Sequence, residues 1–162
     1  MKILFLHGLD SSRESTKFHA ISHPEKFCID VDYRNLSYAS VEYFYHQAIQ
    51  TIKPDLLVGH SLGGYWALKT AAQHKLAVIV ANPSLTPNFR ADYPQLSEEE
   101  LTHSNPKMAY LELGDEQLDM YQVQEKLAPY MNIETFEGGH HRLAYPSRLN
   151  DLIMKIYKKY LA

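Results

Sequence analysis

The chain has 162 residues, of which 45% are hydrophobic and 22% charged, and its formal net charge at pH 7 is −3. That length predicts one globular domain with its own core, and the acidic balance without a basic run excludes the usual nucleic-acid-binding classes. The single cysteine, Cys28, excludes an intrachain disulfide framework, and no apolar stretch approaches the length of a membrane span.

Short apolar runs alternate with longer amphipathic segments, which predicts an α/β fold with a mostly parallel sheet of about six strands. The expected strands are near 2–6, 28–32, 55–59, 76–81, 107–112 and 132–136. The expected helices fit 13–22, 39–52, 62–74, 116–129 and 146–161. The run at 76–81 is apolar on both faces, so we expect helices to cover both sides of the sheet. The first apolar run is too short for a signal peptide, so we expect a cytoplasmic protein.

One segment, 82–106, interrupts this alternation with several prolines and polar residues. Within it, Ser97 and Glu100 have the spacing of a capping box, which predicts a short helix. We interpret 82–106 as a short cap-like insertion within a single domain that spans 1–162. A plain surface excursion is the alternative interpretation.

The run Gly59-His60-Ser61-Leu62-Gly63 lies between an expected buried strand and an expected helix. This pattern is typical of a nucleophile elbow, a sharp turn that holds a serine hydroxyl exposed at the top of a sheet. Glycines on both sides of the serine are needed because side chains there would clash as the backbone turns back. The pattern predicts that Ser61 is a covalent nucleophile.

A serine nucleophile needs a base and an acid that orients the base, and on this fold they follow the serine in the order acid, then histidine. The chain offers Asp115 or Asp119 after the fifth expected strand, and His140 or His141 after the sixth. Both turns lie at the carboxyl ends of strands, where an open α/β sheet gathers its site. Asp115 directly follows the turn glycine and fits the role better than Asp119, whereas spacing does not separate the two histidines.

The oxyanion of a tetrahedral intermediate needs two backbone N–H donors. We expect one from Leu62, after the nucleophile, and one from Leu9, in the loop after the first strand. No metal or cofactor is expected. The pair His19 and His23 has ligand spacing, but no acidic or cysteine partner completes a set.

The chain resembles the small bacterial YqiA/YcfP-type esterases of the α/β-hydrolase superfamily. The resemblance rests on Leu6–Ser12, Val58–Tyr65, Ala81–Ser84, Gly114–Asp119 and Glu137–His141. It implies a compact α/β-hydrolase fold, carboxylesterase-like activity on short acyl esters, and triad roles for Asp115 and His141. Where the family has asparagine before the triad histidine, this chain has His140. The chain is also shorter than typical members after Asn82, which implies a more open site.

Together these features predict a serine hydrolase that cleaves small carboxylic esters or thioesters through an acyl-enzyme on Ser61, with His141 as base and Asp115 as its orienting acid. The expected partner is a small-molecule substrate, with no nucleic acid and no membrane. The alternative is a non-catalytic binding or interaction module that keeps a hydrolase fold with an unused triad. The natural substrate and the oligomeric state do not follow from the sequence.

Overall fold

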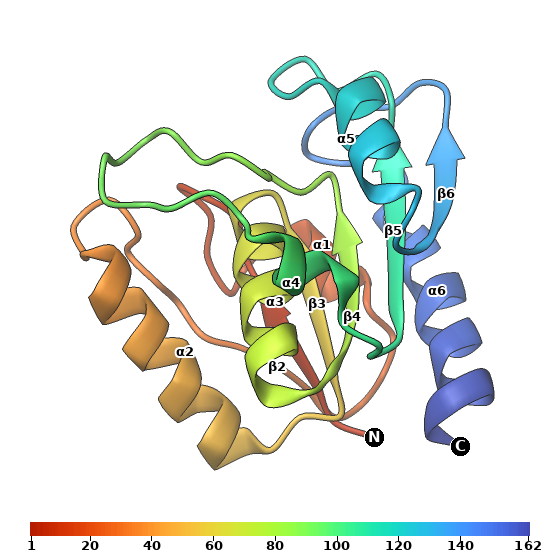
Figure 1. Ribbon diagram of the computed structural model, residues 1–162. Helices are drawn as coiled ribbons and strands as arrows, with labels where there is room; N and C mark the ends of the chain where they lie inside the picture. Colours follow the sequence, from red (N-terminus) through yellow and green to blue (C-terminus); the bar gives the residue numbers. More distant parts are fainter.

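The computed structural model describes residues 1–162, and six strands form one sheet in the order β2-β1-β3-β4-β5-β6 (Figure 1). The strands are β1 (Ile3–Leu6), β2 (Lys26–Cys28), β3 (Leu56–His60), β4 (Ala77–Ala81), β5 (Lys107–Glu112) and β6 (Asn132–Phe136). All neighbouring strands pair in parallel. The predicted six-stranded α/β sheet is confirmed, and its carboxyl ends all lie at one edge.

A helix follows each strand, and the helices pack on both faces of the sheet. They are α1 (Thr16–Ala20), α2 (Tyr38–Ile52), α3 (Leu62–His74), α4 (Glu98–Thr102), α5 (Met120–Leu127) and α6 (Leu149–Ile156), with a 3-10 turn η1 (Pro146–Arg148) and a π turn η2 (Tyr157–Leu161) beside α6. Buried residues of α2, α3, α4 and α5 belong to one hydrophobic cluster, and those of α6 belong to a second. None of the helices is long and apolar enough to cross a membrane.

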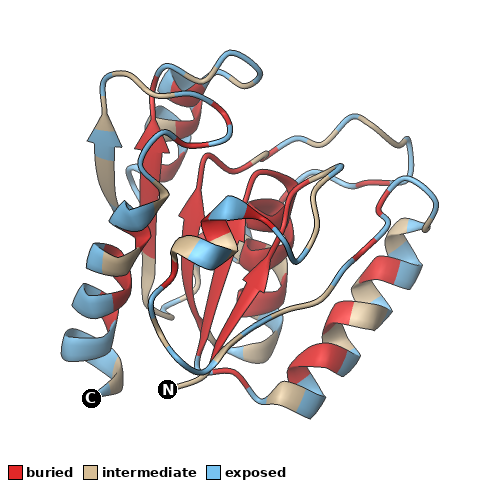
Figure 2. Ribbon diagram, turned by 180° about the vertical axis from the view of Figure 1, so that it is seen from behind, coloured by how far each residue is buried: buried red, intermediate tan, exposed pale blue.

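The two clusters follow from the alternation of side chains along each strand. Leu4 and Leu6 of β1 point into the cluster on the α3 side, whereas Ile3 and Phe5 point into the cluster on the α6 side. Figure 2 shows the central strands as almost wholly buried, and the helices as buried only on their inward faces. The continuous apolar runs in the sequence are therefore strands that bury both faces.

The turn from β3 into α3 is closely packed against β1. A Cβ atom on Gly63 would overlap the backbone carbonyl of Leu6, and one on Gly59 would overlap the carbonyl of Gly63. Neither neighbour is a flexible side chain that could move aside. The glycines of the elbow are therefore required by backbone contact, as the sequence pattern indicates.

Several element boundaries differ from the prediction. The helix expected at 13–22 is only Thr16–Ala20, and the one expected at 146–161 is α6 with a 3-10 turn before it and a π turn after it. The second strand is Lys26–Cys28 rather than 28–32, because the chain leaves the sheet after Cys28 and the Val31 N–H donates to His7 Nε2 at 2.9 Å. The helix expected at 116–129 begins only at Met120, because Asp119 is its N-cap and accepts hydrogen bonds from two N–H groups of its first turn.

The capping box predicted within 82–106 is present. Ser97 Oγ accepts from the Glu100 N–H at 3.2 Å, and the Glu100 carboxylate accepts from the Ser97 N–H at 2.7 Å. These bonds begin α4, whose Leu101 is buried in the core. The other residues between β4 and α4 form turns and irregular chain.

We expect Gly63→Ala to lower the free energy of unfolding by about 3 kcal/mol or more, because the new methyl group would meet backbone rather than a movable side chain. Gly138→Ala is the matched control, since its methyl group would lie 3.1 Å from the far end of the Phe136 ring. Urea unfolding of both variants measures the difference. Equal stability of the two variants would show that the elbow tolerates a side chain at Gly63.

Candidate active site

Ser61 lies at the tip of the turn between β3 and α3, at the carboxyl edge of the sheet. Its backbone has φ 57° and ψ −122°, a conformation that L-residues rarely adopt. Although Ser61 is the N-cap of α3, its hydroxyl makes no capping bond. Instead the hydroxyl lies 2.8 Å from His141 Nε2. The strained turn therefore presents the Ser61 hydroxyl to a histidine rather than to its own helix.

His141 lies in the loop that follows β6, and its other ring nitrogen, Nδ1, lies 2.6 Å from Asp115 Oδ2. Asp115 follows β5, so the three side chains come from the ends of three strands. With the proton on Nδ1 held by the carboxylate, Nε2 is free to accept the Ser61 hydroxyl proton. The arrangement can therefore transfer a proton from the serine to the imidazole.

The Asp115 carboxylate is buried, with 0% of its side chain exposed, and four groups donate to it. Oδ1 accepts from the N–H groups of Gln117 and Leu118, and Oδ2 accepts from the Asn82 side-chain amide and from His141. Burial alone would raise the pKa of Asp115, but these hydrogen bonds outweigh it and lower the pKa below its ordinary value. Asp115 therefore stays ionised beside the imidazole at neutral pH.

The structure places the two competing residues outside this group. Asp119 caps α5 with its side chain. His140 is exposed, and its backbone N–H donates to Glu112. The structure thus brings together Ser61, Asp115 and His141 and leaves Asp119 and His140 aside.

Glu112, a residue that the sequence did not single out, holds the loop that carries His141. Its side chain is fully buried at the end of β5. Its carboxylate accepts from the N–H groups of His140 at 3.1 Å, Ala144 at 2.7 Å and Tyr145 at 2.9 Å, and from the Tyr110 hydroxyl at 2.9 Å. These bonds close the loop on both sides of His141 and fix its position relative to the sheet.

Asn82 is a second buried residue whose role the sequence did not indicate, although a polar residue directly after a buried strand could have signalled it. Asn82 Oδ1 accepts from the Glu112 N–H at 2.8 Å, and its amide donates to the Glu112 carbonyl at 3.1 Å and to Asp115 at 3.0 Å. Asn82 therefore joins the end of β4 to the end of β5 and orients the Asp115 carboxylate.

His60 holds the backbone of His141 through a hydrogen bond. Its Nε2–H donates to the His141 carbonyl oxygen at 2.6 Å. Burial, and to a smaller extent the charge of Lys17, lowers the pKa of His60 to about 3, so the ring is neutral at pH 7. A neutral, fully buried His60 fits a structural role rather than a reactive one.

The loop after β1 lies directly against the serine. A Cβ atom on Gly8 would lie 3.1 Å from Ser61 Cβ, and the next residue, Leu9, has a backbone N–H without a hydrogen-bond acceptor. Leu62 begins α3, and the first N–H groups of a helix lack intrahelical acceptors. Leu9 and Leu62 both line the cavity in front of Ser61.

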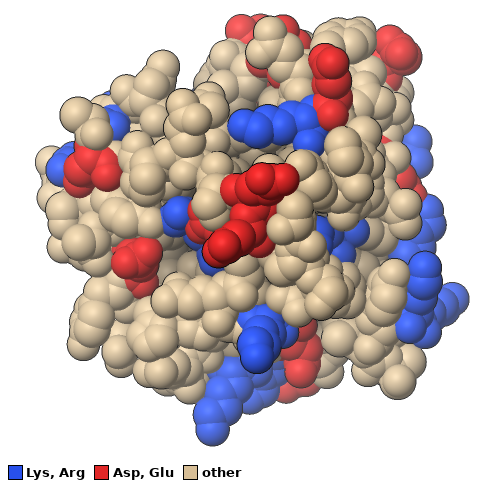
Figure 3. Space-filling model, in the orientation of Figure 1, with Lys and Arg blue, Asp and Glu red and all other residues tan.

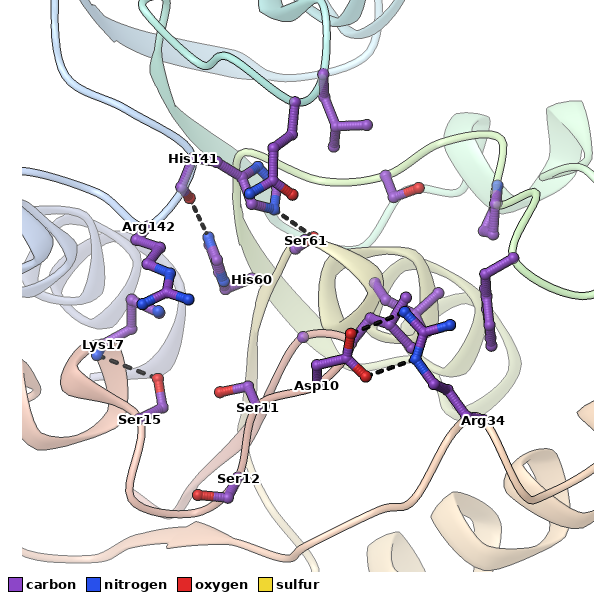
Figure 4. A pocket seen from close by; sticks show the side chains of 18 of the residues that line it. Asp10, Ser11, Ser12, Ser15, Lys17, Arg34, His60, Ser61, His141 and Arg142 are labelled. Atoms are coloured by element: carbon purple, nitrogen blue, oxygen red, sulfur yellow. Dashed lines mark hydrogen bonds and ion pairs between the residues drawn. The ribbon is translucent and has the colours of Figure 1, made fainter.

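That cavity has a volume of about 700 Å³ and is lined by 21 residues, of which only four are hydrophobic. Ligand pockets are usually lined by mainly apolar side chains, so this cavity is unusually polar. Figure 4 shows Ser61 and His141 on one wall, with charged and hydroxyl side chains on either side. Ser84, Pro87, Asn88 and Phe89 bring the segment 82–106 to its rim.

On the face seen in Figure 3, acidic and basic side chains are interspersed over most of the surface, and basic side chains gather along its right edge. No group of three His, Cys, Asp or Glu side chains is placed to hold a metal ion. His19 is one of the two histidines with ligand spacing, and its Nε2 atom lies 3.1 Å from Glu14 Oε2.

Comparison with known proteins places the chain among relatives of similar length. A family model described as "Uncharacterised protein family (UPF0227)" matches residues 2–112. A UPF0227 protein of Shewanella sp. strain MR-4 is 27% identical, with 86% of this chain and 90% of that protein aligned. A UPF0227 protein of Shewanella loihica is 28% identical, with 90% and 91% aligned.

Among solved structures, Est1E from Butyrivibrio proteoclasticus matches with a TM-score of 0.76 and 13% identity, covering 97% of this chain and 86% of that one. A structure described under "LipS and LipT, two metagenome-derived lipolytic enzymes" also has a TM-score of 0.76 and 13% identity, covering 98% and 94%. A putative hydrolase of the alpha/beta superfamily from Xanthomonas campestris has a TM-score of 0.70 and 18% identity, covering 95% and 98%. These likenesses show that the fold is that of the α/β hydrolases.

We expect Glu112→Gln to lower the free energy of unfolding by about 1–3 kcal/mol, because either orientation of the amide would set its NH₂ group against at least one buried N–H. The amide protons of His140, Ala144 and Tyr145 should exchange faster with solvent. Hydrogen exchange and urea unfolding measure both effects. Glu125→Gln, on the exposed face of α5, is the control, and equal exchange in the two variants would contradict this role for Glu112.

Proposed function

The chain belongs to the UPF0227 family and has the α/β-hydrolase fold, and on this basis we propose that it is a serine hydrolase that cleaves small carboxylic esters or thioesters. The observation that carries the proposal is the hydrogen-bonded series Ser61–His141–Asp115 at the cavity wall. A serine whose hydroxyl is hydrogen-bonded to a carboxylate-oriented imidazole is the arrangement that acyl transfer requires.

In the proposed reaction, Ser61 Oγ attacks the substrate carbonyl while His141 Nε2 takes the hydroxyl proton. Asp115 holds the imidazole in the tautomer with its proton on Nδ1 and stabilises the imidazolium that forms. The N–H groups of Leu62 and Leu9 stabilise the oxyanion, an effect of about 3–4 kcal/mol per donor in a comparable enzyme. Apart from the substrate, this acylation step uses only groups of the chain itself.

His141 then returns its proton to the leaving alcohol or thiol, and the bond from the carbonyl carbon to the leaving group breaks. A water molecule attacks the acyl-enzyme with His141 again as base, which releases the carboxylic acid and restores the Ser61 hydroxyl. The names of the structural neighbours agree with ester chemistry on this fold, since one describes ferulic acid bound to Est1E and another describes lipolytic enzymes.

Ser61→Ala should lower kcat for p-nitrophenyl butyrate by about 1,000-fold or more, because the covalent step is lost, while the protein stays folded. Ser147→Ala is the matched control, since Ser147 is exposed and lies outside the cavity. Release of p-nitrophenol measures the rate, and circular dichroism checks the fold. Turnover that survives Ser61→Ala would refute the mechanism.

A pair of aspartate variants separates the orienting acid from the helix cap. Asp115→Asn should lower kcat by about 10⁴-fold, the loss seen when the corresponding residue of a comparable triad is changed, because the amide no longer fixes the histidine tautomer. Asp119→Asn should leave kcat unchanged, because asparagine caps a helix as well as aspartate does. A larger loss in Asp119→Asn than in Asp115→Asn would reverse the assignment.

A further inference from the structure

We propose that the cavity holds an anion-binding subsite beside Ser61, formed by Lys17 and Arg142, and that the substrate is an ester or thioester that carries a carboxylate or phosphate group. The inference rests on the proposed hydrolase function, because it names the class of substrate for the same serine. It starts from two cations that the fold places in the cavity without a counter-ion.

Lys17 is unusual among the lysines of the chain because only 6% of it is exposed. A surface lysine ordinarily extends its ammonium group into solvent. Lys17 lies in α1 and lines the cavity, yet it makes no ion pair and its ammonium group makes no hydrogen bond. The side chain of Lys17 is therefore largely buried while its unpaired ammonium group stays open to the cavity, where a bound ligand can supply the counter-charge.

Arg142 follows His141 directly and lines the cavity, and its side chain makes no ion pair with an acidic residue. Figure 4 shows Lys17 and Arg142 side by side on the same flank of the cavity, and the charge of Arg142 acts on Lys17. Burial first, and Arg142 second, lower the pKa of the Lys17 ammonium group. Two like charges held together repel each other, and an anion bound between them would remove that repulsion.

The acidic residues that line the cavity do not neutralise this pair. Asp10 is held on the opposite flank by a two-pronged hydrogen bond from Arg34, at 2.6 and 2.8 Å (Figure 4). Glu14 accepts from His19 at 3.1 Å. Arg34 therefore has its carboxylate, whereas Lys17 and Arg142 have none.

Hydroxyl groups extend the donor set, with Ser15 beside Lys17 and with Ser11 and Ser12 between Ser15 and Asp10 (Figure 4). Ser12 Oγ and Ser15 Oγ accept hydrogen bonds from the N–H groups of Glu14 and Lys17, respectively, but no acceptor takes their hydroxyl protons. The Ser11 hydroxyl, also labelled in Figure 4, makes no hydrogen bond. Cations and hydroxyl donors together are what a carboxylate or phosphate prefers, because such groups only accept hydrogen bonds.

The position of the subsite relative to Ser61 fixes how a substrate would lie. His60 separates Lys17 from the serine and stays neutral, so it adds no charge of its own. The four hydrophobic residues of the lining, Leu9, Leu62, Phe89 and Leu118, leave little apolar wall for a long acyl chain. A short substrate with an anionic end therefore matches this cavity better than a long-chain lipid does.

The test compares each anionic ester with its neutral methyl ester. In one pair, p-nitrophenyl hydrogen glutarate carries the anion in the acid half, and its methyl ester is the neutral control. In a second pair, S-butyryl 3-mercaptopropionate carries the anion in the leaving group, and its methyl ester is again the control. We expect the anionic member of at least one pair to have a kcat/KM about tenfold higher, and the preferred pair identifies the half that binds.

Lys17→Met and Arg142→Gln should each lower this anionic-to-neutral ratio of kcat/KM by about tenfold, the loss of one charge-assisted hydrogen bond. Arg142 is exposed, so its variant is expected to fold even if the Lys17 variant does not. Lys158→Met removes the same charge from an exposed site in η2 and should leave the ratio unchanged. A ratio near one for both pairs, or a ratio unaffected by Arg142→Gln, would overturn the subsite while leaving the hydrolase proposal intact.

Direct binding separates failure of the subsite from failure of the hydrolase proposal. Isothermal titration of the folded protein with glutarate should give an affinity that weakens about tenfold in Arg142→Gln and falls as sodium chloride is raised. This measurement does not depend on turnover. No binding by the wild-type protein would overturn the subsite even if Ser61 proved inert.

Discussion

The turn between β3 and α3 is the constraint on which the rest of the structure depends. Ser61 adopts its left-handed backbone only because Gly59 and Gly63 let the strand and helix fold back onto β1 without steric overlap. The same close packing places the loop after β1 against the serine. One local geometry thus turns the Ser61 hydroxyl toward His141, begins a helix directly after the serine, and packs the loop after β1 against it.

A buried polar cluster joins the remaining strand ends to this turn. Asn82 after β4 bonds to the backbone of Glu112 and to Asp115, and the Glu112 carboxylate holds the loop that carries His141. Apolar packing has no direction, so it fixes a loop less sharply than a fully bonded carboxylate does. The distance from Ser61 Oγ to His141 Nε2 therefore depends on the Glu112 carboxylate, although that carboxylate contacts neither atom.

The sequence predicted the parts of the fold whose signals are local. The buried strands, the elbow around Ser61 and the capping box at Ser97 all depend on residues near one another in the chain, and the structure confirms them. The second strand was placed too late, because the run after Cys28 is used for contacts with the loop after β1 rather than for the sheet.

Other features depend on distant contacts and could not be inferred from spacing. In the sequence, Glu112 is only a polar residue at the end of a strand. Its role depends on the loop after β6, whose N–H groups donate to its carboxylate in the folded chain. His140 and His141 differ only in which way the loop turns them. Lys17 looks like one lysine of an amphipathic helix, and only its burial beside Arg142 marks it as part of the cavity.

Labelling with a fluorophosphonate probe shows whether Ser61 is an activated nucleophile. The probe reacts with an activated serine whatever the natural substrate is, and mass spectrometry of the digested protein locates the adduct. We expect one phosphonyl group per chain, attached to Ser61. Folded protein that takes up no probe, or takes it up at another residue, would show that Ser61 is not the nucleophile.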